Sequence, residues 1–318
     1  MRAPFDVRSL ARALPLALPA LLFRGGCCPS DSGSSFQSIP VEALLRQTDG
    51  AVVIPMGDAA LTPEQCAELC ASLALAVRSG CRLLRDVDGG VSAVQCQVPI
   101  ACYAGRAPAG LAPVTSASDD ALTRYFADAQ RMEAAAVQAF EILAGELAAH
   151  GAPPSLVARS LRAADDERRH AALTAAIVRA QGGSILPLAL APVTPRGFAP
   201  MVIENAVEGC ARETVAAMVA LHQARHAEDP TARAAFAQIA DDELTHAALS
   251  WDLARWTARH SAPSTRREAR EGWRDAVESL RPTRDVDDGF ARALGLPDGR
   301  TQRALLDALG RFDPARVS

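Results

Sequence analysis

Between residues 118 and 260, apolar side chains recur every three or four positions, the spacing that gives an α-helix one buried face. The pattern divides into four long segments, which we expect to be helices. Ser118-Asp119-Asp120 supplies an N-cap for the first segment, and Asp229-Pro230 separates the third from the fourth. The four expected helices cover residues 118–150, 155–181, 201–226 and 231–260.

The connections between these helices predict how they are arranged. The first and second helices are joined by a short break, as are the third and fourth, whereas a Pro-rich stretch at 183–200 joins the two pairs. Two hairpins joined by one long crossover predict an all-α main domain, a four-helix bundle over residues 118–260. The tail, residues 263–318, contains two weaker helical stretches, which we expect to wrap around the bundle.

The pattern before the bundle is different. Residues 41–115 alternate short apolar runs with Gly, Asp and Pro turns, which predicts a small, partly β region with one helix near 62–78. Five cysteines fall in this region, and Cys28 makes their number even. We expect a disulfide-stapled region, because a zinc ribbon needs closer pairs than Cys66 and Cys70. The disulfide candidates are Cys28, Cys66, Cys70, Cys81, Cys96 and Cys102, while Cys210 is expected to be a buried free thiol.

The first 26 residues have the pattern of an export signal. A basic start is followed by an apolar run at 13–23 that is too short to cross a bilayer comfortably. Cys27 follows two glycines and precedes a Ser-rich stretch, 27–40, expected to be a flexible tether. This resembles a bacterial lipoprotein cleavage site, although Arg24 stands where such sites usually have Leu. We expect export to the periplasm or cell envelope, with or without lipidation of Cys27.

Composition narrows the interpretation. The chain is 49% hydrophobic but only 4% aromatic, so its core must consist mainly of Ala, Leu and Val, which favours closely packed helices. The net charge of −4 does not suggest a nucleic acid or an anionic membrane surface as a partner. Contact with a membrane is therefore expected only through a lipid anchor.

An internal repeat carries the candidate chemistry. ADDERRHAAL at 164–173 and ADDELTHAAL at 240–249 match at eight of ten positions, each in the second helix of a hairpin. Their shared core is Asp-Glu-x-x-His. Residues three apart lie on one helix face, so each Glu and His can bind the same metal ion or two neighbouring ions. The alternative is an ordinary ion pair on each solvated helix surface. The repeated residues are Asp166, Glu167, His170, Asp242, Glu243 and His246.

Two further ligands are expected from the first helix of each hairpin. Glu133 precedes Glu167 by 34 residues, and Glu208 precedes Glu243 by 35. Burial of an unpaired carboxylate is costly, and a bound metal would explain it. On the first helix, Glu141 breaks the matched spacing and Glu146 lies too near the turn.

The third helix offers two other glutamates. Glu204 shares a face with Glu208 and is a candidate extra ligand. Glu213 is about 140° from Glu208 on an α-helix, so we expect it to lie outside the site, pairing with an Arg or at the edge of the core. The remaining histidines are expected to be structural or solvated: His150, His222, His226 and His260.

One Glu from each first helix and one Glu-x-x-His from each second helix resemble the ferritin-like di-iron or di-manganese carboxylate superfamily. The resemblance covers residues 118–260 and implies a site for two iron ions, with manganese as the alternative. DERRH at 166–170 also resembles a motif of bacterial multicomponent monooxygenases. The second copy has Thr245 where that motif has Arg, so the monooxygenase activity is not inferred.

The resemblance allows two functions. The first is a di-iron oxidoreductase that reacts with dioxygen or peroxide and an unidentified small-molecule reductant or substrate. Ala134, Ala135 and Gly209 beside the ligands would leave room for a small oxidant. The second is a non-enzymatic iron-binding or metal-stiffened scaffold protein at the cell surface.

Asp166 and Asp242 are the expected partners of the histidines. A metal-bound histidine needs an acceptor for its second ring N–H. Each aspartate points about 100° away from the ligand glutamate that follows it, toward the neighbouring helix. We therefore expect an exchanged pairing, Asp242 with His170 and Asp166 with His246. The alternative is that both aspartates are solvated.

Overall fold

The computed structural model describes residues 106–108, 111, 118–188, 190, 195–280, 288–312 and 314, with the backbone of three strands nearer the N-terminus. The chain forms two compact units. One comprises Asp31–Ala101 and Ala112–Val114, and the other comprises Met1–Ser30, Cys102–Leu111 and Thr115–Ser318. The expected signal peptide, the helix near 62–78, and Cys27, Cys28, Cys66, Cys70 and Cys102 lie outside the described residues.

The smaller unit contains an antiparallel sheet of three described strands: β1 (Ser34–Pro40), β2 (Cys81–Arg85) and β3 (Val91–Pro99). Their order is β1-β3-β2, and the register between β2 and β3 shifts at Leu84/Arg85. Cys81 and Cys96 are direct register partners. The backbone of β1 is paired with β3 although its Ser-rich sequence is typical of a flexible tether.

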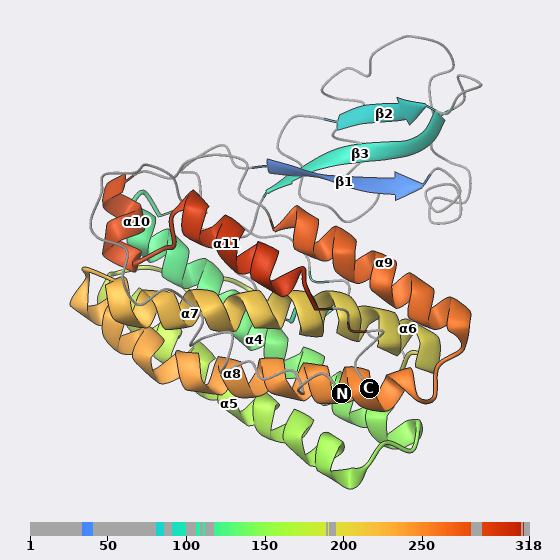
Figure 1. Ribbon diagram of the computed structural model, residues 1–318. Coiled ribbons are helices and arrows are strands. Elements are labelled where there is room, and N and C mark those ends of the chain that lie inside the picture. The colour runs from blue at the N-terminus through green and yellow to red at the C-terminus, as the bar shows by residue number, and fades with distance from the viewer. Residues whose placement is uncertain are drawn as a thin grey trace. The chain divides into compact units, whose positions relative to one another are not determined.

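The larger unit is built from long helices (Figure 1). The first two are α4 (Ala121–Ala149) and α5 (Pro154–Ala180), and the last of the main set is α8 (Pro230–Ala258). The helix between them is continuous but changes type: α6 (Phe198–Glu204) runs into a π-helix, η1 (Asn205–Glu213), which runs into α7 (Thr214–His226).

The helix ends follow local sequence signals. Asp120 accepts hydrogen bonds from the backbone N–H and the hydroxyl of Thr123, each at 2.7 Å, and caps α4. Asp229 caps α8 by accepting from Ala232 N at 2.7 Å. Gly151 follows α4 with a φ of 71°, a conformation that suits glycine at a helix end.

Short connections make α4 and α5 one hairpin, and α7 and α8 another. α4 packs along α5, α7 packs along α8, and α5 contacts α8. Fully buried Phe140, Leu143 and Leu147 of α4 share one apolar cluster with Met218 of α7 and Trp251 of α8. Most of the other buried apolar residues on these helices are alanine, so the backbones pack closely.

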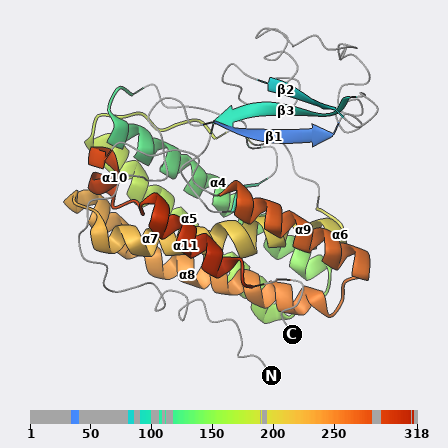
Figure 2. The same cartoon turned by 45° about the horizontal axis from the view of Figure 1, so that its top comes forward.

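The tail contains three described helices where the sequence predicts two: α9 (Pro263–Ser279), α10 (Asp288–Leu294) and α11 (Gly299–Leu309). α9 packs on α6 and η1, while α11 packs on α7 (Figure 2). Within the described part of the chain, no helix combines the length and the apolar character needed to cross a membrane.

Candidate metal centre

The repeated glutamates and histidines of α5 and α8 meet in the interior. Glu167 and His170 of α5 are 2% and 3% exposed, and Glu243 and His246 of α8 are 6% and 0% exposed. Their ligand atoms form two adjacent groups, each with all its atoms within 4.8 Å of one another. The first group is Glu133, Glu167, His170 and Glu243, and the second is Glu167, Glu213 and His246.

Two carboxylates lie between the histidines. Glu167 Oε1 is 3.2 Å from His246 Nδ1, while its Oε2 is 3.6 Å from His170 Nδ1. Glu243 Oε1 is 3.5 Å from His170 Nδ1 and 3.7 Å from His246 Nδ1. Glu167 belongs to both groups, while Glu133 belongs to the group of His170, with its Oε2 3.6 Å from Nδ1.

The far side of each imidazole is held by an aspartate from the other hairpin. His170 Nε2 donates to Asp242 Oδ2 at 3.1 Å, and His246 Nε2 donates to Asp166 Oδ2 at 3.2 Å. This is the exchanged pairing that the repeat predicts. Because each aspartate accepts from Nε2, each Nδ1 points toward the carboxylates and would be the atom that binds a metal once its own proton is displaced.

Several ligand atoms in the centre lack hydrogen-bond partners. His170 Nδ1, His246 Nδ1, Glu167 Oε2 and Glu213 Oε2 are all buried and unpartnered. Buried polar atoms without partners are rare, because burial without a hydrogen bond is costly. Four such atoms facing one another fit a site that binds cations.

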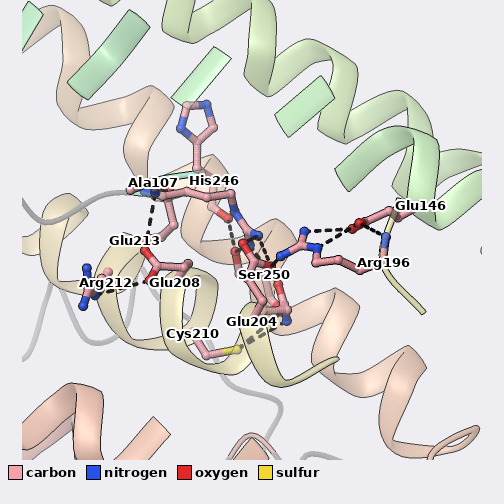
Figure 3. A network of polar contacts seen from close by, with 12 residues as sticks. Ala107, Glu146, Arg196, Glu204, Glu208, Cys210, Arg212, Glu213, His246 and Ser250 are labelled. Atoms are coloured by element: carbon pink, nitrogen blue, oxygen red, sulfur yellow. Dashed lines mark hydrogen bonds and ion pairs between the residues drawn. The ribbon is translucent and has the colours of Figure 1, made fainter. Parts of the chain in front are cut away.

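The third helix contributes a different glutamate from the one expected. Glu208 lies outside both groups: its Oε2 accepts from Ala107 N at 3.3 Å and its Oε1 is 3.6 Å from Arg212 Nε (Figure 3). Glu213, 0% exposed, lies in the group with Glu167 and His246. The reason is the π-helix, whose wider i→i+5 turns rotate later residues relative to an α-helix. An α-helical count across Asn205–Glu213 therefore assigns the wrong face.

The other candidates on these helices lie outside the two groups. Glu204 pairs with Arg106 and, at 3.7 Å, with Arg196. Glu146 is buried and bound by Arg196, and Glu141 pairs with Arg168. The remaining histidines contact backbone carbonyls instead: His150 with Arg196, His222 with Gly295, His226 with His222 and His260 with Trp256. Cys210 is a buried free thiol, as expected.

Without metal, protons bound to the side chains of the centre offset the negative charge of its carboxylates. Burial, reinforced by repulsion from Glu167, raises the pKa of Glu133 well above its ordinary value. Burial and repulsion from Glu243 raise the pKa of Glu213 to about 8. Burial lowers the pKa of His170, but the carboxylates of Glu133 and Glu167 outweigh it and raise that pKa to about 11. Metal binding would therefore displace protons.

Arg106 lies beside the centre, a position that the sequence did not indicate. Its side chain is 0% exposed, and its backbone N donates to Glu213 Oε1 at 2.5 Å. The segment around it has no periodic pattern that would place it among the helices. Gly209, expected to leave room for an oxidant, instead leaves room for this guanidinium: a Cβ at Gly209 would lie 2.5 Å from Arg106 Nη2.

A pocket of about 350 Å³ lies between α5 and α8 and reaches the outer side of the centre. His246 and Asp166 form part of its wall, next to Arg162 and Thr245. Arg159 and Arg169 also line it, and both are paired with aspartates. Among the described contacts Arg162 has no acidic partner, so the pocket offers one uncompensated cation near the Asp166–His246 pair.

No family model, curated protein or solved structure matches this chain. What is established is a helical unit with a buried cluster of Glu and His side chains that are close enough to hold metal. This is compatible with a ferritin-like site.

Proposed function

We propose that this chain is an exported ferritin-like di-metal carboxylate protein, with α4, α5, the continuous α6–α7 helix and α8 as its four-helix bundle. Its centre would hold two iron ions, with manganese as the alternative. The observation that supports this most directly is the pair of unpartnered histidine Nδ1 atoms, each facing carboxylates and each held from behind by an aspartate.

The donor set fits two divalent cations. Glu133, Glu167, Glu213 and Glu243 would contribute four negative charges, equal to the charge of two such ions. Oxygen-rich sites with one imidazole each suit iron or manganese better than copper or zinc. Glu133, Glu167, Glu243 and His170 would hold one ion, and Glu167, Glu213 and His246 would hold the other.

We further propose that the protein is an oxidoreductase. Bound ferrous iron would supply the electrons that dioxygen or peroxide accepts. The protein's part is to orient the ligands: Asp242 and Asp166 hold the imidazoles, and burial excludes bulk water from the ligand atoms. An external reductant would approach through the α5–α8 pocket, where Arg162 favours a small anion.

The test is metal analysis followed by an anaerobic optical titration of the purified protein with ferrous iron. We expect two ions per chain and fast re-oxidation on adding dioxygen or peroxide, with turnover when a reductant is present. Slow, stoichiometric uptake without turnover would instead indicate iron binding or a metal-stiffened scaffold. A chain that retains no transition metal after reconstitution would contradict the metal centre itself.

Matched histidine variants make this test specific. His170→Ala and His246→Ala should each reduce the metal content, because each removes an unpartnered ligand atom. His260→Ala removes an exposed imidazole that contacts the carbonyl and the ring of Trp256 and belongs to neither ligand group, so it should leave the metal content unchanged.

A further inference from the structure

The buried guanidinium of Arg106 is bound from several sides at once. Nη1 donates to both carboxylate oxygens of Glu204 at 2.8 Å, and Nη2 donates to Asn205 Oδ1 at 2.9 Å and to Ser250 Oγ at 3.4 Å. The guanidinium also lies over the ring of Phe140, 5.4 Å from its centroid. These contacts fix the side chain among α4, α6, η1 and α8.

Anchoring this side chain fixes the backbone that carries it. The peptide N–H of Arg106 donates to Glu213 at 2.5 Å, and that of Ala107 donates to Glu208 at 3.3 Å. Both acceptors are carboxylates of η1, but only Glu213 belongs to the cluster of ligand atoms. Figure 3 shows Glu208 held between Ala107 and Arg212, an arrangement that keeps it engaged outside the cluster.

The helix is shaped to receive the guanidinium. A Cβ on Gly209 would lie 2.5 Å from Arg106 Nη2 and 2.6 Å from both Asn205 Oδ1 and Ser250 Oγ. Glycine at this position therefore preserves the space where these three groups meet. The same region adjoins a ligand, because Phe140 also packs against the His246 ring, with centroids 5.0 Å apart.

We propose that Arg106 is a positioning residue of the metal centre: it holds Glu213, which the π-helix turns inward, in place as the ligand, while the neighbouring Ala107 keeps Glu208 engaged outside the cluster. The inference rests on the proposed metal-binding function. In this proposal residues 106–108, which precede the bundle in the sequence, complete the metal centre.

The first part of the test compares the two glutamates. Glu213→Gln and Glu208→Gln are titrated with Co²⁺, whose optical spectrum reports the ligand geometry, and bound metal is counted. We expect Glu213→Gln to lose one of the two ions and Glu208→Gln to bind both as the native chain does. The opposite order, or equal effects, would overturn the assignment of the ligand.

The second part removes the guanidinium contacts in two independent ways. Arg106→Met deletes the charge, whereas Gly209→Ala fills its space and leaves every charged group in place. Each variant should weaken the binding of one ion by roughly 10–100-fold and change the Co²⁺ spectrum. The double variant should be little weaker than either single one, because both changes act through the same group.

The controls separate this role from general destabilisation. Leu305→Ala removes a buried side chain of α11, a helix that packs on α7, and should lower Tm without weakening the binding of either ion. If the Arg106→Met and Gly209→Ala variants bind both ions with native affinity and spectrum, Arg106 has no positioning role. That result would leave the proposed metal-binding function standing. A native chain that binds no ion would contradict the proposed function.

Discussion

At the scale of the single residue, the centre depends on four side chains that pair across the two hairpins. Asp242 of α8 holds His170 of α5, and Asp166 of α5 holds His246 of α8. Each aspartate directly precedes a glutamate of the candidate centre. One helical turn therefore supplies both a candidate ligand and the acceptor for the histidine of the other hairpin. Arg169 adds a cation at this junction, pairing with Asp166 at 2.5 Å and with Asp242 at 3.2 Å.

The aspartate pairs lead to a direct prediction. Asp166→Ala or Asp242→Ala should weaken metal binding by roughly 10–100-fold, because the imidazole loses the acceptor that fixes its tautomer. The neighbours Asp165 and Asp241 are the matched controls. Both are exposed, and Asp165 pairs only with Arg168 among the described contacts, so their Ala variants should bind metal normally. Isothermal titration with Mn²⁺ would measure all four, and equal effects from inner and outer variants would refute the assignment.

At the scale of the element, the π-helix is the feature with the largest consequence. Its i→i+5 turns bring Glu213 to the centre and turn Glu208 toward Arg212. It also contains Gly209, where Arg106 enters. A regular α-helix from Phe198 to His226 would present a different set of side chains to α5 and α8.

The sheet of the smaller unit supports a prediction about the cysteines. Cys81 and Cys96 are register partners on neighbouring antiparallel strands, where Cα atoms lie about 4.5–5.5 Å apart, within the range of a disulfide. We expect these two to be bonded to each other and the other cysteines of this unit to be oxidised too. Thiol counting and peptide mapping under denaturing, non-reducing conditions would measure this. A free thiol at Cys81 or Cys96 would contradict this pairing, and five free thiols from Cys66 to Cys102 would contradict the disulfide-stapled region as a whole.

At the scale of the whole molecule, the centre places four glutamate carboxylates among helices whose buried apolar residues are mostly alanine. Protons balance these carboxylates in the metal-free chain, as the raised pKa values of Glu133 and Glu213 indicate. We therefore expect metal binding, as proposed above, to be coupled to folding through the same groups.

This coupling predicts a pH dependence. The pKa of Glu213 rises on folding from 4.5 to about 8, so its stabilising contribution is present below 4.5 and decreases as the pH rises toward 8. The raised pKa of His170 acts in the same direction. We expect the Tm of the metal-free chain to fall between about pH 5 and 8, while the extra Tm given by Mn²⁺ grows.

Differential scanning calorimetry at low ionic strength, with and without Mn²⁺, would measure both trends. Glu213→Gln removes one titrating group and should flatten the decline of the metal-free chain. A metal-free Tm that stays level or rises across this range would contradict the coupling.

The sequence by itself determined the features set by neighbours along the chain. Helix ends followed from local caps such as Asp120 and Asp229 and from breakers such as Gly151. The faces of Glu167, His170, Glu243 and His246 followed from three-residue spacing within regular α-helices. The exchanged aspartate pairing followed as well, because the two repeats occupy equivalent places in their hairpins.

Only the tertiary structure decided which carboxylate of the third helix joins the centre and what lies beside it. Counting along an α-helix favoured Glu208, but the π-helix changed the rotation per residue and brought Glu213 inward. Arg106 reaches Glu204 from 98 residues away in the sequence, and no periodic pattern encodes such a contact. Within a regular helix, local spacing determines the direction in which each side chain points. The register of an irregular helix and the insertion of a distant side chain depend instead on how the whole chain packs.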